Sequence, residues 1–164
     1  MNLAIYKMSI GTFMIAADND AITMVKLIGF DDPPSIATTS DPPHDNSPSG
    51  LTDLAAKQLE EYLNGNRREF DLPLKTSGTV FQQAVWEALK SIPYGQTRSY
   101  KQVALMINKP NACRAVGMAN NKNPIWIIIP CHRVIGSNGS LVGYGGGLDN
   151  KRKLLLLENP GFIE

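Results

Sequence analysis

The sequence predicts a mixed α/β (α+β) fold, with a small antiparallel sheet in an N-terminal domain and a mainly helical C-terminal domain. Three observations support this prediction: short apolar runs near the start, a proline-rich break, and longer segments with helical periodicity after it. A chain of 164 residues suits one domain or two small ones. We place the two domains at residues 1–78 and 79–164.

The first domain opens with three short apolar-rich runs, at residues 4–9, 12–17 and 21–28. Short polar or glycine-containing turns separate them, which is typical of a small antiparallel meander. Residues 31–50 then contain five prolines among Ser, Thr and Asp, and they predict a mobile loop or linker with little buried surface. His44 lies in this stretch and is expected to be solvated.

Three further helices are predicted from the spacing of apolar residues and from the residues that commonly begin or end a helix. Apolar residues recur three and four apart over residues 51–63, with a glycine shortly after them, and again over residues 79–91, with a proline after them. A last helix is predicted over residues 150–158, where Asp149 can act as the N-cap. The glycine-rich stretch before it predicts turns.

A pair of short helices is predicted in the middle of the second domain. Ser99 can cap a helix over residues 100–107, and Asn111 can cap another over residues 112–120, after a turn of about four residues. Two short helices joined in this way form a helix-turn-helix signal. The signal is weak by itself, because many helix corners of this kind bind nothing.

Charge is unevenly distributed along the chain. Residues 1–89 carry six Lys/Arg and twelve Asp/Glu, while residues 90–164 carry ten Lys/Arg and three Asp/Glu. A basic C-terminal half favours contact with a polyanion, although a lysine-coated helical surface gives the same count. The second short helix carries Arg114 beside the small residues Ala115 and Gly117, which permit close approach to a partner.

One cysteine lies beside a histidine. Residues 125–129 are branched and apolar, so we expect a buried strand that ends at Pro130 and delivers Cys131 next to His132. A nearby histidine is the usual means of converting a thiol into the nucleophilic thiolate. The alternative is a cysteine that acts as a small core hydrophobe, and these two residues alone do not decide between them.

Other classes of protein fit poorly. Two cysteines, Cys113 and Cys131, make no disulfide framework, and His44 and His132 lie far apart, so we predict neither a metal site nor a cofactor. No apolar run approaches the roughly 20 residues that span a bilayer. The N-terminus has no secretory signal pattern, and we expect a cytoplasmic protein with no membrane partner.

Several short motifs occur together in the C-terminal half. They are Ile92-Pro93-Tyr94-Gly95, Ser99-Tyr100, Arg114-Ala115-Val116-Gly117, Asn123-Pro124, Pro130-Cys131-His132-Arg133-Val134, Tyr144-Gly145-Gly146-Gly147-Leu148 and Glu158. In order and spacing, over roughly residues 79–158, this half resembles the O6-alkylguanine-DNA alkyltransferases, also called methylated-DNA–protein-cysteine methyltransferases. The first 78 residues resemble that family only in general plan.

The resemblance implies a DNA-repair methyltransferase that reacts once. Cys131 would take a methyl or other alkyl group from O6 of guanine and keep it as a thioether, and O4 of thymine stays open as a second target. His132 would be the base for Cys131, and Glu158 would orient His132. The implied partner is double-stranded DNA that contains O6-alkylguanine, with the target base flipped out of the duplex. No cofactor is implied, and we expect a monomer.

The resemblance also implies roles for residues around this centre. Asn123 would be a hinge that ties backbone groups together, and Tyr100 would donate its phenol proton toward N3 of the departing guanine. The substrate pocket would be formed by Val134, Tyr144, Gly145 and Trp126, where Trp126 could narrow the space for the alkyl group. The DNA-binding residues would be Arg114, Ala115, Gly117 and Ser99.

Two other functions, a damage-binding module and a Cys-His hydrolase, are alternatives to a methyltransferase. A module that binds alkylated DNA without chemistry would share the scaffold, but such relatives carry tryptophan in place of the cysteine, and this chain has Cys131. A Cys-His hydrolase would need an oxyanion hole, and it would leave Arg114 and the basic C-terminal half without a role.

Overall fold

A computed structural model describes residues 1–28 and 49–164. The chain forms two compact units, Met1–Lys75 and Thr76–Glu164. The predicted linker at residues 31–50 lies outside the described residues except at its end, where Ser49 and Gly50 begin a helix. His44 also lies outside the described residues.

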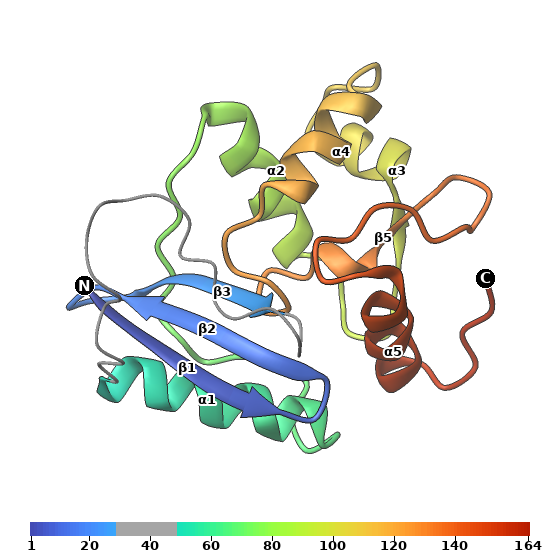
Figure 1. Ribbon diagram of the computed structural model, residues 1–164. Coiled ribbons are helices and arrows are strands. Elements are labelled where there is room, and N and C mark those ends of the chain that lie inside the picture. The colour runs from blue at the N-terminus through green and yellow to red at the C-terminus, as the bar shows by residue number, and fades with distance from the viewer. Residues whose placement is uncertain (29–48) are drawn as a thin grey trace. The chain divides into compact units, whose positions relative to one another are not determined.

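The first unit contains the predicted meander. Strands β1 (Asn2–Met8), β2 (Gly11–Ala17) and β3 (Ile22–Ile28) form one antiparallel sheet in the order β1-β2-β3 (Figure 1). Most residues of β2 are buried, which accounts for its nearly continuous apolar sequence. The two-residue turn between β1 and β2 fixes their register.

Helix α1 (Gly50–Leu63) belongs to the same unit as the sheet. Ser49 caps it: its side chain accepts from the backbone N–H of Thr52, and the Thr52 side chain accepts in return from the backbone N–H of Ser49. Its buried face includes Leu59, and the Tyr6 hydroxyl of β1 donates to Asp53 Oδ1 at 2.6 Å. The helix begins one residue before the predicted start.

The second unit is mainly helical, as predicted. Its elements are α2 (Val80–Lys90), β4 (Arg98–Ser99), α3 (Tyr100–Met106), α4 (Cys113–Asn121), the 3-10 helix η1 (Cys131–Arg133), β5 (Val134–Ile135) and α5 (Leu148–Glu158). Strands β4 and β5 form a short parallel pair, so the start of α3 is joined to the segment that follows Cys131.

Helices α2, α3 and α4 pack against one another in this unit (Figure 1). Val85, Leu89 and Val116 are fully buried there. Trp86 is nearly as buried, and its indole N–H donates to the backbone oxygen of Ala119 at 2.9 Å, so α2 is hydrogen-bonded to α4.

Helix boundaries in this unit lie within two residues of the predictions, and two of the predicted N-caps are corrected. Thr79 and Ser99 are the N-caps of α2 and α3, each with its side chain bonded to the helix. Asn111, however, is not a cap: α4 begins after Ala112, without a side-chain cap, because the preceding turn runs one residue further. Helix α5 starts after Gly147, two residues early, which places Asp149 in its first turn.

Residues 125–129 do not form the predicted strand, although three of them are buried. Ile127 has a φ of 71°, in the left-handed region, and the N–H of Ile129 donates to the carbonyl of Ile125 at 3.0 Å. The segment is therefore a closed turn, with Ile125, Ile127 and Ile129 buried. A short apolar run signals burial without fixing an extended backbone, and that explains the error.

Among the described residues, no helix has the length and apolar character needed to cross a membrane.

Candidate active site

Cys131 is the first residue of η1, directly between the buried turn at residues 125–129 and strand β5. Its exposed fraction is only 3%. Its backbone N–H donates to the carbonyl of Ile129 at 2.8 Å. A hydrogen-bonded turn, and not the end of a strand, therefore positions the cysteine.

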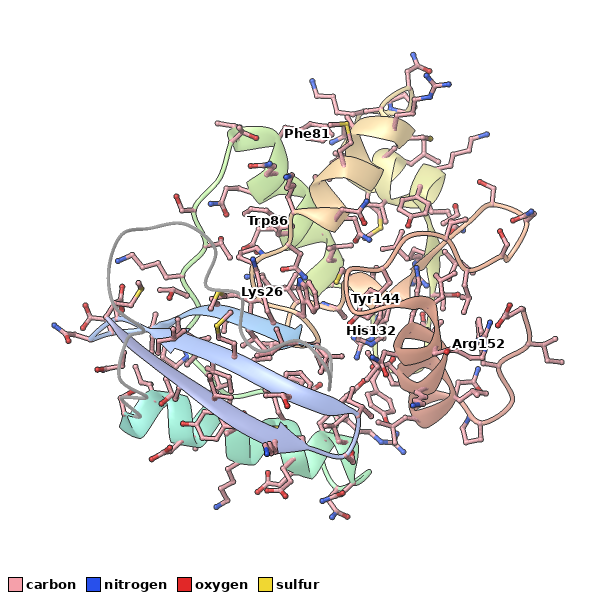
Figure 2. All side chains as sticks on the ribbon, in the orientation of Figure 1. Lys26, Phe81, Trp86, His132, Tyr144 and Arg152 are labelled. Carbon is pink, nitrogen blue, oxygen red and sulfur yellow. The ribbon has the colours of Figure 1, made fainter. Side chains whose placement is uncertain are left out.

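His132 and Glu158 meet in the interior of the second unit. His132 Nε2 lies 2.8 Å from Glu158 Oε1, and neither side chain is more than 1% exposed. Glu158 is the last residue of α5, and His132 lies beside that helix (Figure 2). The expected pair is thus formed by two residues 26 positions apart in the sequence.

Arg133 completes a buried network around Glu158. Its guanidinium donates from Nε to Glu158 Oε2 at 2.9 Å and from Nη2 to Glu158 Oε1 at 2.8 Å. Its third bond, from Nη1, goes to the carbonyl of Ile92 at 2.7 Å. Bidentate pairing of this kind fixes the orientation of the carboxylate. Sequence reasoning did not assign a role to Arg133.

The pKa shifts within this network follow from burial and pairing. Burial raises the pKa of Glu158, but the hydrogen bonds and charges of His132 and Arg133 outweigh it and hold that pKa well below its usual range. Burial lowers the pKa of His132, with Glu158 opposing that shift. A neutral imidazole that donates from Nε2 to Glu158 keeps its lone pair on Nδ1, where a proton can be taken up.

The pKa of the Cys131 thiol is raised in this environment. Burial raises the pKa of Cys131 to about 11, although the Asn123 side chain and the charge of Lys151 act in the opposite direction. A buried thiol with this pKa is a poor nucleophile near neutral pH. The site therefore needs a proton acceptor at the moment of reaction.

Lys151 is a functional candidate that sequence reasoning missed. Its side chain has no exposed surface, and its ammonium donates to the carbonyls of Val134 at 2.6 Å and Val142 at 3.1 Å. Burial lowers its pKa to about 8, and it interacts electrostatically with Cys131. Its spacing was a usable signal: Lys151 lies seven residues before Glu158, so both occupy one face of α5.

Asn123 closes the turn that precedes Cys131. Its amide Nδ2 donates to the carbonyl of Ile129 at 2.8 Å, and its Oδ1 accepts from the N–H of Ile125 at 3.0 Å. Both groups of this buried side chain are therefore used on the backbone of one short segment. Such bonds suit the hinge role that the resemblance implies.

Tyr100 and the expected pocket residues lie in the same unit. The Tyr100 hydroxyl, at the start of α3, donates to the carbonyl of Val142 at 2.9 Å. The rings of Trp126 and Tyr144 are 5.9 Å apart, and a Cβ added at Gly145 would lie 2.6 Å from Cζ2 of Trp126. The indole therefore lies against glycine backbone where no larger residue fits.

The expected DNA-binding residues lie on α4 and at the start of α3. Arg114 and Ala115 are exposed, and a Cβ added at Gly117 would lie 3.8 Å from the ring of Tyr100. Ser99 caps α3, since its hydroxyl accepts a hydrogen bond from the backbone N–H of Gln102.

Comparisons with known proteins match the two units to the two domains of one protein family. Residues 1–76 match the model of the 6-O-methylguanine DNA methyltransferase ribonuclease-like domain, and residues 80–160 match that of the DNA-binding domain. A methylated-DNA–protein-cysteine methyltransferase from Mycobacterium bovis is 48% identical over 150 residues, covering 91% of this chain and 87% of that protein. One from Methanosarcina barkeri is 62% identical over 104 residues, covering 63% of this chain and 66% of that protein.

The crystal structure of Mycobacterium tuberculosis OGT in complex with DNA matches with a TM-score of 0.85 at 42% identity, covering 98% of this chain and 94% of that one. The fold and the buried cysteine site define a transferase that acts on DNA with its own cysteine. The chain belongs to the methylated-DNA–protein-cysteine methyltransferase family. The reaction of this family repairs O6-alkylguanine by alkyl transfer to a cysteine of the protein.

Proposed function

We propose that Cys131 is the acceptor in this repair reaction and that duplex DNA with O6-alkylguanine is the substrate. The thiolate sulfur attacks the alkyl carbon, the new C–S bond forms as the bond from carbon to O6 breaks, and guanine leaves with the electron pair. A thioether is not hydrolysed like an acyl bond, so each molecule reacts once. The observation that carries the proposal is a buried cysteine beside the His132–Glu158 pair.

The thiol proton moves to His132 when the substrate is in place. Because Glu158 holds the Nε2–H, the proton goes to Nδ1, directly or through a bridging water. Glu158 is kept ionised by Arg133, so it stabilises the imidazolium that forms. The ammonium of Lys151 further stabilises the thiolate.

The departing guanine is neutralised and positioned by three kinds of group. Tyr100 donates its phenol proton toward N3, which requires its hydroxyl to exchange the Val142 carbonyl for the base. The carbonyls of Cys131 and Val134 accept from the exocyclic amine, and the N–H of Gly145 reaches O6. Trp126 narrows the space left for the alkyl group.

Helices α3 and α4 act as a helix-turn-helix that meets the duplex. Exposed Arg114 occupies the space that the flipped base leaves, and the small, exposed Ala115 lets the helix approach the DNA closely. The burial of Cys131, which is 3% exposed, supports flipping, because a base inside the duplex cannot reach its thiol.

The test is a mass measurement on the intact protein after incubation with a duplex that contains O6-methylguanine. We expect one added methyl group, on the peptide that contains Cys131, and an unmodified Cys113, which lies at the start of α4. Cys131→Ser should abolish transfer, whereas Cys113→Ser should preserve it. Methyl transfer by Cys131→Ser would overturn the assignment, and binding without transfer by the unaltered protein would favour a damage-binding module.

A further inference from the structure

Asn120 has a buried acceptor atom that the mechanism above does not use. The residue lies in the last turn of α4 and is 3% exposed. Its amide Nδ2 donates to the carbonyl of Cys131 at 3.4 Å, and the amide lies close enough to the Tyr100 hydroxyl to lower the pKa of that phenol against the larger effect of burial. Its Oδ1 is buried, and within the described part of the chain it has no hydrogen-bond partner.

The orientation of this amide is fixed by its neighbours. Rotation by 180° about the last side-chain bond would place Oδ1 against the Cys131 carbonyl, so that two acceptors would face each other. The arrangement with Nδ2 on the carbonyl is therefore the favourable one. It leaves Oδ1 unsatisfied, and an unsatisfied buried acceptor costs stability unless a ligand supplies the missing donor.

The substrate carries one suitable kind of donor. Alkylation at O6 removes the N1 proton of guanine, so the exocyclic amine provides the remaining N–H donors of the base's pairing edge. That amine has two N–H groups, and the two carbonyls assigned to it already accept other hydrogen bonds in the free protein, so Asn120 Oδ1 can share one N–H with a carbonyl. Asn120 donates to Cys131, and Lys151 donates to Val134.

We propose that Asn120 Oδ1 accepts a hydrogen bond from the exocyclic amine of the flipped O6-alkylguanine and makes the site selective for bases that carry this amine. The proposal rests on the function proposed above, since it requires the base to enter beside Cys131. Asn120 thereby connects the helix that meets DNA to the pocket that reads the base. A site built to bond an N–H group rejects analogues that lack it, because its acceptor then stays buried and unpaired.

The test compares two duplexes, one with O6-methylguanine and one with O6-methylhypoxanthine, which is the same base without the exocyclic amine. Methyl-transfer rates are measured in single turnover at saturating protein. We expect the unaltered protein to react faster with the guanine, and Asn120→Leu, which keeps the branching and removes both polar groups, to lower that rate ratio by about tenfold. Asn121→Leu, an exposed neighbour on α4, should leave the ratio unchanged.

The rate ratio within one preparation does not depend on how much of the protein is correctly folded, because inactive molecules do not react. Should Asn120→Leu give no folded protein, Asn120→Ala provides the same ratio. Equal slowing of both substrates would overturn the proposal and leave Asn120 as a residue that only positions Tyr100. An unaltered protein that transfers methyl groups with a ratio of one would overturn it as well, whereas no transfer to Cys131 from either duplex would refute the function itself.

Discussion

At the residue scale, Lys151 places a positive charge within electrostatic reach of a buried thiol. We predict that Lys151→Met slows methyl transfer at pH 7 by about tenfold, since one unit of thiol pKa corresponds to a factor of ten in thiolate. Its pKa of about 8 lies below the ordinary 10.5, so the ammonium loses its proton as the pH rises through 8. The rate advantage over the variant should therefore shrink above pH 8.

Transfer rates between pH 6 and pH 10 at saturating protein check this prediction. Lys151→Arg, which keeps a charge that does not titrate in this range, serves as the control and should show no such loss above pH 8. An advantage that stays constant across pH would mean that Lys151 acts by holding the Val134 and Val142 carbonyls and not by its charge.

Lys151 also shows which residues of the site could be predicted from the sequence and which could not. Cys131, His132 and Glu158 were assigned from motifs, and the structure brings His132 and Glu158 together. Lys151 was missed because a lysine that is followed by Arg152 and Lys153 near the start of a helix normally extends into solvent. Only the fold places the carbonyls of two separate segments around its ammonium.

At the element scale, helices were predictable where local signals fix them. The capping pairs of Thr79 and Ser99 lie within four residues of the bonds they make, so sequence alone locates α2 and α3. Residues 125–129 were not predictable in the same way. Their turn depends on both hydrogen bonds of Asn123 and on a left-handed Ile127, and tertiary packing selects that backbone.

Helix α4 carries the exposed Arg114. Arg114→Ala should slow repair of a duplex by more than tenfold, because replacing a flipped base compensates for an unstacking cost of a few kcal/mol. Transfer from O6-methylguanine as a free base, which needs no flipping, should change little. Parallel rate measurements on the two substrates provide the comparison.

Lys122→Ala is the matched control, since it removes an exposed charge just after the other end of α4. It should weaken duplex binding without the large loss of rate at saturating protein. Equal losses for Arg114→Ala on the duplex and on the free base would argue against a role of Arg114 in base extrusion.

At the scale of the whole molecule, the uneven distribution of charge favours binding to DNA through the C-terminal half. Residues 90–164 carry ten basic and three acidic side chains, so contacts to phosphates are expected there. Few side chains on α4 can read base edges, and repair has to scan any sequence. We predict nearly sequence-independent binding whose logarithmic affinity falls linearly with the logarithm of salt concentration, by about 0.9 per phosphate neutralised.

Titrations of unrelated duplexes at several salt concentrations measure that slope. Lys101→Gln and Lys109→Gln, both exposed near α3, should each reduce the slope by about one, because each removes one phosphate contact and the counterion it releases. Lys57→Gln, an equally exposed lysine of α1 in the acidic part of the chain, should leave the slope as it is. A flat salt response would mean that phosphate contacts do not supply the affinity. Strong preference for one undamaged sequence would be the behaviour of a regulator, since a protein that scans for damage gains its affinity from phosphates present in every sequence.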